Sequence, residues 1–209
     1  MMFRRTFLKT VLVLALAVGA FPGLGHAQTG DAAQKFITSL AQKAITTVAD
    51  RQLSQSDRDD RFRKLFVSAF DIPEIGRFVL SRSWRTATPE QQQEFLGLFE
   101  EITVLTWSKR FQDYNGESLE TVSATKDGDR NWFVDSHILR AQGTQIPVQW
   151  RLKEADDGSF HVIDIVVEGV SMAITHRSDY AAALQANGGR VDGLLTIMRT
   201  KLDQLKAAG

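Results

Sequence analysis

Apolar residues recur at helical spacing through the first half of the chain. Between residues 31 and 52 no Pro or Gly occurs, and the helical spacing of the apolar positions predicts a first helix. These positions are Phe36, Ile37, Leu40, Ile45 and Val48. A second helix is expected after Ser54 or Ser56, either of which can cap it. Its apolar stripe has the spacing of an amphipathic helix that faces a core. The stripe consists of Phe62, Leu65, Phe66, Ala69 and Phe70.

Two further helix starts follow, each with a capping residue and a proline in the first turn. The sequence Asp71-Ile72-Pro73-Glu74 opens a third helix, which we expect to end at Trp84. The sequence Thr88-Pro89-Glu90-Gln91 opens a fourth, with Gln91 placed to close a capping box. This fourth helix is predicted to be the longest and to run to about Tyr114.

Near Asn115-Gly116 the apolar period changes from 3.6 to 2, which predicts that a sheet follows. Strands are expected over residues 119–126, 131–140, 144–154 and 160–167, joined by short Asp/Gly turns and therefore antiparallel. Two more helices are expected over 178–186 and 191–206. The fold class predicted is α+β, with a helical N-terminal part, a curved four-stranded antiparallel sheet and C-terminal helices packed back on it.

Residues 1–27 have the pattern of an export signal. Arg4, Arg5 and Lys9 form a positive region, an apolar stretch of signal length follows, and Gly25-His26-Ala27 suits cleavage after Ala27. The string at 3–9, F-R-R-T-F-L-K, resembles the twin-arginine export motif; an ordinary secretory signal with two arginines is the alternative. Both interpretations predict a periplasmic chain of residues 28–209 forming one domain.

Composition excludes several classes of function. Without the signal, 22 Lys and Arg face 25 Asp and Glu, so no basic field favours nucleic acid. The chain has no cysteine, which excludes disulfides, thiolate metal sites and cysteine catalysis. After residue 27 no apolar run reaches the roughly 20 residues of a spanning helix, so we do not expect an integral membrane protein.

Several motifs in register resemble one known family. They are D-I-V-V-E-G-V-S-M at 164–172, N-G-G at 187–189, V-D-G-L-L at 191–195, F-D-I-P-E-I-G-R-F-V-L at 70–80, Trp84-Arg85, T-P-E-Q at 88–91 and F-Q-D-Y-N-G at 111–116. Together they make the chain similar to the MlaC family, also described as toluene-tolerance proteins, which includes a relative associated with hopanoid biosynthesis. The resemblance covers essentially all of residues 28–209.

The resemblance implies a periplasmic phospholipid carrier with an NTF2-like sheet and a deep apolar pocket. Such a carrier shuttles lipid between an outer-membrane lipoprotein–porin complex and an inner-membrane ABC transporter, buries the acyl chains and leaves the headgroup near solvent. We therefore expect a monomer whose ligand is phospholipid, with no cofactor, no metal and no enzymatic activity. Headgroup preference and the choice between phospholipid and hopanoid cargo stay open.

The apolar faces of the second to fourth helices and one sheet face are the candidate pocket walls. Filling a solid core is the alternative for each residue. The candidate lipid-binding residues are Phe62, Phe66, Phe70, Ile75, Phe78, Val79, Phe95, Phe99, Ile102, Trp132, Val134, Val148, Trp150, Ile165 and Val167.

Two other kinds of function compete with the carrier. A catalytic pair on the sheet is the first, either Asp135 with His137 or His161 with Asp164. A scaffold with a solid core is the second. Three arginines near the third helix, Arg77, Arg82 and Arg85, are positioned to touch phosphate or an acidic partner, or they form a solvated basic face.

Overall fold

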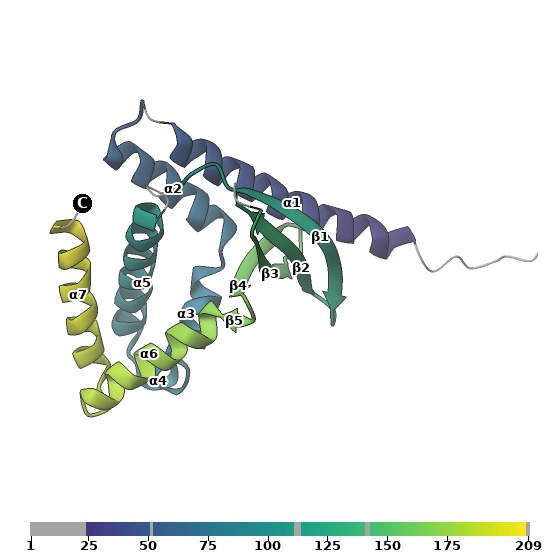
Figure 1. Cartoon of the computed structure of the whole chain (residues 1–209). Coiled ribbons are helices and arrows are strands. Elements are labelled where there is room, and N and C mark those ends of the chain that lie inside the picture. The colour runs from purple at the N-terminus through teal and green to yellow at the C-terminus, as the bar shows by residue number, and fades with distance from the viewer. Residues whose placement is uncertain (1–23, 51, 111–113, 141–142, 208–209) are drawn as a thin grey trace, which may run out of the picture.

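The computed structural model describes residues 24–50, 52–110, 114–140 and 143–207. Figure 1 shows a helical part and a twisted sheet, with the long first helix lying along the sheet. The predicted signal at 1–27 falls mostly outside the described residues. The elements follow the order α1 (Leu24–Ala49), α2 (Gln55–Ala69), α3 (Ile72–Leu80), α4 (Arg82–Thr86), α5 (Pro89–Arg110), β1 (Ser118–Asp127), β2 (Asn131–Leu139), β3 (Gln145–Glu154), β4 (Phe160–Val167), β5 (Val170–Ser171), α6 (Met172–Ala186) and α7 (Val191–Ala207).

Side-chain caps fix the starts of the helices as the sequence predicts. Ser54 accepts a hydrogen bond from the backbone N–H of Asp57 at the start of α2, and Asp71 accepts one from Glu74 at the start of α3. At the start of α5, Thr88 and Gln91 exchange reciprocal bonds of 3.2 and 3.0 Å, which form the predicted capping box.

The sheet is a simple antiparallel meander in the order β1-β2-β3-β4-β5. Bulges interrupt the register between Thr121 and Ser123 on β1 and between Arg151 and Leu152 on β3. Bulges increase the local twist of a sheet. The α+β class and the antiparallel order are confirmed, and the sheet gains one short strand, β5, beyond the four predicted.

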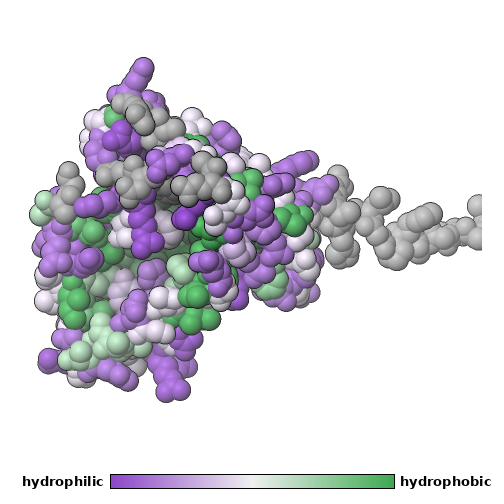
Figure 2. All heavy atoms as spheres, in the orientation of Figure 1, coloured by the Kyte–Doolittle hydropathy of each residue, from purple (hydrophilic) through white to green (hydrophobic). Residues whose placement is uncertain are grey.

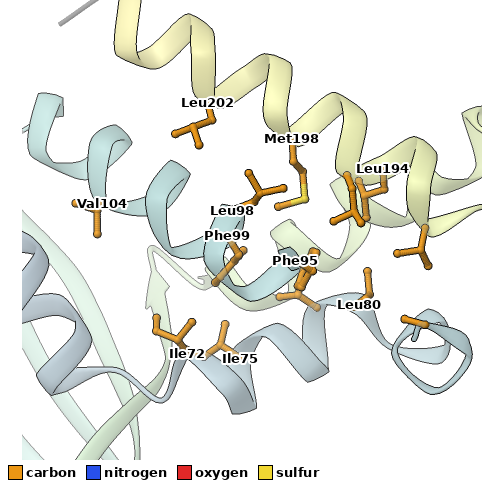
Figure 3. Packing of buried hydrophobic residues seen from close by; sticks show 14 of the residues in the cluster. Ile72, Ile75, Leu80, Phe95, Leu98, Phe99, Val104, Leu194, Met198 and Leu202 are labelled. Atoms are coloured by element: carbon orange, nitrogen blue, oxygen red, sulfur yellow. The ribbon is translucent and has the colours of Figure 1, made fainter. Parts of the chain in front are cut away.

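Buried residues form two separate apolar clusters. The helical cluster joins α2, α3, α5, α6 and α7, and Figure 3 shows α7 lying over α5 with Leu98, Met198 and Leu202 between the helices. The sheet cluster joins α1 to β2, β3 and β4 through residues such as Ile37 and Trp132. Because the two clusters are distinct, the helices and the sheet do not share one continuous solid core.

The boundaries of three predicted helices were wrong. The third helix does not run to Trp84, because Ser81 adopts φ 55° and divides it into α3 and α4. The helix predicted over 178–186 is α6, and it begins at Met172, six residues before the predicted start, because Ser171 caps it. The first helix ends at Ala49 instead of Gln52 and begins at Leu24, ahead of the predicted start at Asp31. The predicted end of α5 lies outside the described residues beyond Arg110.

Candidate functional site

An apolar cavity of about 270 Å³ lies between the two clusters. In Figure 2 hydrophobic residues gather between the helices and the sheet. Walls come from α1, α2, α3, α5, the sheet and the first turns of α6. The lining residues are Leu40, Ala41, Ala44, Ile45, Phe62, Leu65, Phe66, Phe70, Ile75, Phe99, Thr103, Trp107, Tyr114, Glu117, Ser118, Leu119, Ile138, Val148, Trp150, Ile163, Asp164, Ile165, Val167, Met172, Ala173 and His176.

Aromatic side chains form one wall of the cavity. Phe66 stacks on Phe62 with ring centroids 6.2 Å apart and on Phe70 with centroids 4.3 Å apart. On the sheet, the indole N–H of Trp150 donates to Ser136 Oγ at 2.9 Å, and this hydroxyl donates to the carbonyl of Val148 at 3.0 Å. The indole is therefore held with its polar atom satisfied and its ring available to the cavity.

A buried carboxylate joins the sheet to α6 beside the cavity. Asp164 on β4 accepts hydrogen bonds from Ser171 Oγ at 2.6 Å and from the backbone N–H of Ala173 at 2.9 Å. Arg151 lies 3.7 Å from the same carboxylate, whose side chain is only 6% exposed. Because the first turn of α6 supplies Met172, Ala173 and His176 to the lining, Asp164 positions one wall of the cavity.

The polar lining residues come mostly from two places, the start of β1 and the start of α6. At β1, the backbone N–H of Asn115 donates to Glu117 at 2.8 Å, and this bond, helped by Arg140, holds the pKa of Glu117 below its usual range. At α6, burial lowers the pKa of His176, against the opposing effect of Asp179 and Asp164. Near neutral pH the lining therefore carries an ionised carboxylate at β1 and a neutral imidazole at α6.

Nine of the fifteen candidate lipid-binding residues line the cavity. They are Phe62, Phe66, Phe70, Ile75, Phe99, Val148, Trp150, Ile165 and Val167. They come from five elements and the α2–α3 junction, and the fold brings them to one space although they lie up to about a hundred positions apart in sequence.

Six candidates lie outside the cavity. Val79 and Phe95 are buried in the helical cluster, and Ile102 packs against that cluster. Trp132 and Val134 are buried under α1 in the sheet cluster. Phe78 is 41% exposed on the outer side of α3. Helical and strand periods identify the apolar faces, but part of each face packs against a neighbouring helix or strand and not against the cavity.

Sequence reasoning missed the contribution of α1 and α6. Leu40, Ala44 and Ala41 lie on the side of α1 toward the cavity, and Met172 and His176 lie at the start of α6. The apolar period of the first helix included Leu40 and Ile45, which gave a signal for its buried face. No signal identified Met172 or His176, because the predicted start of that helix came after both.

The proposed catalytic pairs do not form a shared site at the cavity. Asp135 accepts hydrogen bonds from Ser123 and Gln149 at 2.9 Å each, and neither Asp135 nor His137 lines the cavity. Asp164 does line it, but both of its oxygens are engaged at the start of α6, and His161 is absent from the lining. Within the described ranges no group of three His, Asp or Glu side chains has the arrangement of a metal site.

Among the residues that the structure describes, no helix combines the length and the apolar character that crossing a bilayer requires.

Comparison with known proteins identifies the relatives of this chain. Residues 38–200 match the family model described as MlaC protein. The toluene tolerance protein ttg2D of Pseudomonas putida is 25% identical over 134 residues, which are 64% of this chain and 62% of that protein.

A solved structure of similar fold comes from Ralstonia solanacearum and is described as a phospholipid-binding protein in complex with a phospholipid. It has a TM-score of 0.72 and 21% sequence identity, and the match covers 83% of this chain and 98% of that one. The family match spans most of the chain, including every described element from α2 to β5 and α6. The chain therefore belongs to the MlaC protein family.

Proposed function

We propose that this chain is a periplasmic lipid carrier that holds phospholipid acyl chain in the apolar cavity between its helices and its sheet. The observation that carries the proposal is the cavity itself, which is lined by aromatic and aliphatic side chains and lies between two well-packed clusters. The similar fold of a phospholipid-binding protein that contains a phospholipid supports it. The nine candidate residues that line the cavity are the proposed acyl-chain contacts.

The hydrophobic effect explains why a carrier needs such a space. Each methylene exposed to water costs about 0.8 kcal/mol, so an acyl chain of about fifteen methylenes costs roughly 12 kcal/mol outside a bilayer or a pocket. Moving the chain from bilayer to cavity is close to neutral, because both surroundings are apolar. The cavity therefore removes the penalty of crossing water without holding the lipid irreversibly.

Cavity size bears on the number of acyl chains held. A water molecule takes up about 30 Å³ in the liquid, so 270 Å³ is room for roughly nine groups of water or methylene size. That capacity suits part of one acyl chain. The rest of the lipid requires side-chain movement or contact with the outside of the cavity.

The polar residues at the start of β1 suit the headgroup end of a lipid. Tyr114, Glu117 and Ser118 line the cavity there, and Ser118 is exposed. A headgroup placed beside them stays hydrated while its acyl chain is buried, which avoids the cost of burying charge. We place the acyl chain along the aromatic wall of α2 and the sheet.

Export and partners complete the proposal. We propose that residues 1–27 direct export by the twin-arginine route and are cleaved after Ala27, which would remove the first turn of α1. The mature monomer would then exchange lipid with an outer-membrane lipoprotein–porin complex and an inner-membrane ABC transporter, as the family membership suggests. The intact mass of the periplasmic protein tests the cleavage site.

Filling the cavity tests the carrier function. Ala44→Trp places an indole from α1 into the lining, and Ala32→Trp places the same group on the exposed side of the same helix. Both mature variants and the parent chain are purified without detergent, extracted with organic solvent and analysed by mass spectrometry. We expect diacyl phospholipid with the parent and with Ala32→Trp, and a severalfold lower yield with Ala44→Trp.

Two results would contradict different parts of the proposal, the binding site and the cargo. Equal lipid in Ala44→Trp and Ala32→Trp would place the lipid outside this cavity. A different lipid class in the extract, such as a hopanoid, would keep the carrier and change its cargo. The thermal midpoints of both variants show whether a loss of lipid reflects unfolding.

A further inference from the structure

An exposed surface of arginine and apolar residues lies on α3, β5 and α6. We call it the α3/α6 surface and define it by Arg77 and Phe78 of α3, Val170 of β5, and Ile174 and Arg177 of α6. Phe78 is 41% exposed, and Val170 and Ile174 are each 53% exposed. These three are half of the large hydrophobic side chains exposed among the described residues.

Contacts between the two helices bring this surface together. The guanidinium of Arg177 lies 5.2 Å from the ring centroid of Phe78, so α6 and α3 present the pair on one side of the molecule. Ile174 and Arg177 are three positions apart on α6 and therefore lie on one face of the helix. Figure 1 shows α3, α4 and α6 next to one another, and Figure 2 shows hydrophobic residues where α6 meets β5.

Four exposed arginines lie on or beside this surface, and the nearby charge is positive on balance. Arg82 and Arg85 of α4 are exposed, and α4 approaches Arg77, whose guanidinium lies 5.8 Å from the ring centroid of Trp84. The carboxylates nearby in sequence are the exposed Glu90, Glu168 and Asp179, against four arginines, and Glu74, whose partner is Lys153. The mature chain as a whole is slightly acidic, so this cluster does not reflect its general composition.

We propose that the α3/α6 surface docks onto membranes that contain anionic phospholipid. Apolar side chains surrounded by arginines are typical of surfaces that rest in the headgroup region of a bilayer. The neighbouring face of α6, about 100° around the helix, supplies Ala173 and His176 to the cavity, so docking here brings that cavity wall close to the lipid source. The inference rests on the proposed carrier function, which requires lipid to move without exposure to water.

Vesicle flotation tests the proposal. The probes are vesicles of phosphatidylcholine alone and vesicles of equal parts phosphatidylglycerol and phosphatidylcholine. The test variant is Ile174→Ser with Arg177→Glu. The matched control is Val67→Ser with Arg61→Glu, which removes an exposed apolar side chain and reverses one charge on α2. All chains are the mature full-length protein.

We expect the parent chain and the control to float with the phosphatidylglycerol vesicles and to dissociate at high salt. The test variant should bind at least about tenfold more weakly, since it loses an apolar contact and reverses a charge that each favour the anionic surface. Equal binding of test and control variants would overturn the proposal. A parent chain that binds no vesicles would also overturn it. That result would hold even if the test variant had lost binding to a membrane protein, since a protein partner is a different occupant of the surface.

The lipid content of each variant separates this inference from the carrier function. Neither Ile174 nor Arg177 lines the cavity, so the test variant should retain the phospholipid of the parent. Phospholipid in every chain without vesicle binding would reject the α3/α6 surface alone. Vesicle binding without phospholipid in any chain would reject the carrier function and leave the docking surface standing.

Discussion

Asp164 holds the first turn of α6 against the sheet, and its replacement by alanine should strongly destabilise the protein. The change leaves the backbone N–H of Ala173 and the hydroxyl of Ser171 without their acceptor. Arg151 also loses its carboxylate partner at 3.7 Å. Because Asp164 is buried, water cannot easily replace these interactions.

The size of the effect follows from the number of bonds lost. A hydrogen bond to a charged group contributes about 1.5–3 kcal/mol, so two such bonds and a partly buried ion pair give a loss of about 3–5 kcal/mol. With an m-value of about 2 kcal/mol/M, the urea midpoint should fall by about 2 M. Ser171→Ala removes one bond and the N-cap of α6 and should cost only about 1–2 kcal/mol.

Urea unfolding of delipidated protein, followed by circular dichroism, measures these differences without the stabilising effect of bound ligand. Asp179→Ala is the matched control, because Asp179 is an exposed aspartate on α6, the helix that Asp164 holds against the sheet. Its change should stay within about 0.5 kcal/mol. A loss below about 1 kcal/mol for Asp164→Ala, or equal losses for the two aspartates, would refute the role assigned to Asp164.

Three further predictions concern buried and half-buried side chains. Burial raises the pKa of Tyr180 to about 12. The stability contributed by its neutral phenol is therefore complete below pH 10 and is lost as the pH rises toward 12. The difference between the ultraviolet titration curves of the parent chain and of Tyr180→Phe measures this pKa. Burial lowers the pKa of His176, so the stability contributed by its neutral imidazole is present above pH 6.5 and is lost as the pH falls. Between pH 7 and pH 5 the thermal midpoint of the parent should therefore fall by more than that of His176→Phe. Equal falls would contradict this prediction. Phe95→Ala should cost about 3–5 kcal/mol in urea unfolding. It should leave any bound phospholipid in place, because Phe95 belongs to the helical cluster and not to the cavity; loss of lipid from folded protein would contradict that.

The sequence predicted the order and class of the elements because local signals mark most of their ends. Caps at Ser54, Asp71 and Thr88 coincide with the starts of α2, α3 and α5. The break at Ser81 could not be predicted, because a serine with positive φ has no sequence signature of the kind that Gly or Pro provides. The early start of α6 escaped notice because Ser171 serves both as the end of β5 and as the N-cap.

The candidate site was predictable only in part, since a hydrophobic period shows which face is buried and not what covers it. Phe95 and Phe99 lie one turn apart on α5, yet Phe99 reaches the cavity and Phe95 does not. Trp132 and Trp150 share the inward face of the sheet, but α1 covers the first and leaves the second beside the cavity. Whether such a residue becomes cavity wall or solid core depends on contacts between distant segments, such as α1 against Trp132 and Tyr180 of α6 against Phe95.

Native mass spectrometry of the mature chain tests the central claim most directly. After purification without detergent, the protein should carry an added mass that corresponds to one diacyl phospholipid per chain. Collisional activation should remove that mass as intact lipid. A chain observed at its bare polypeptide mass, with no lipid recovered from the same sample, would contradict the account of an occupied apolar cavity.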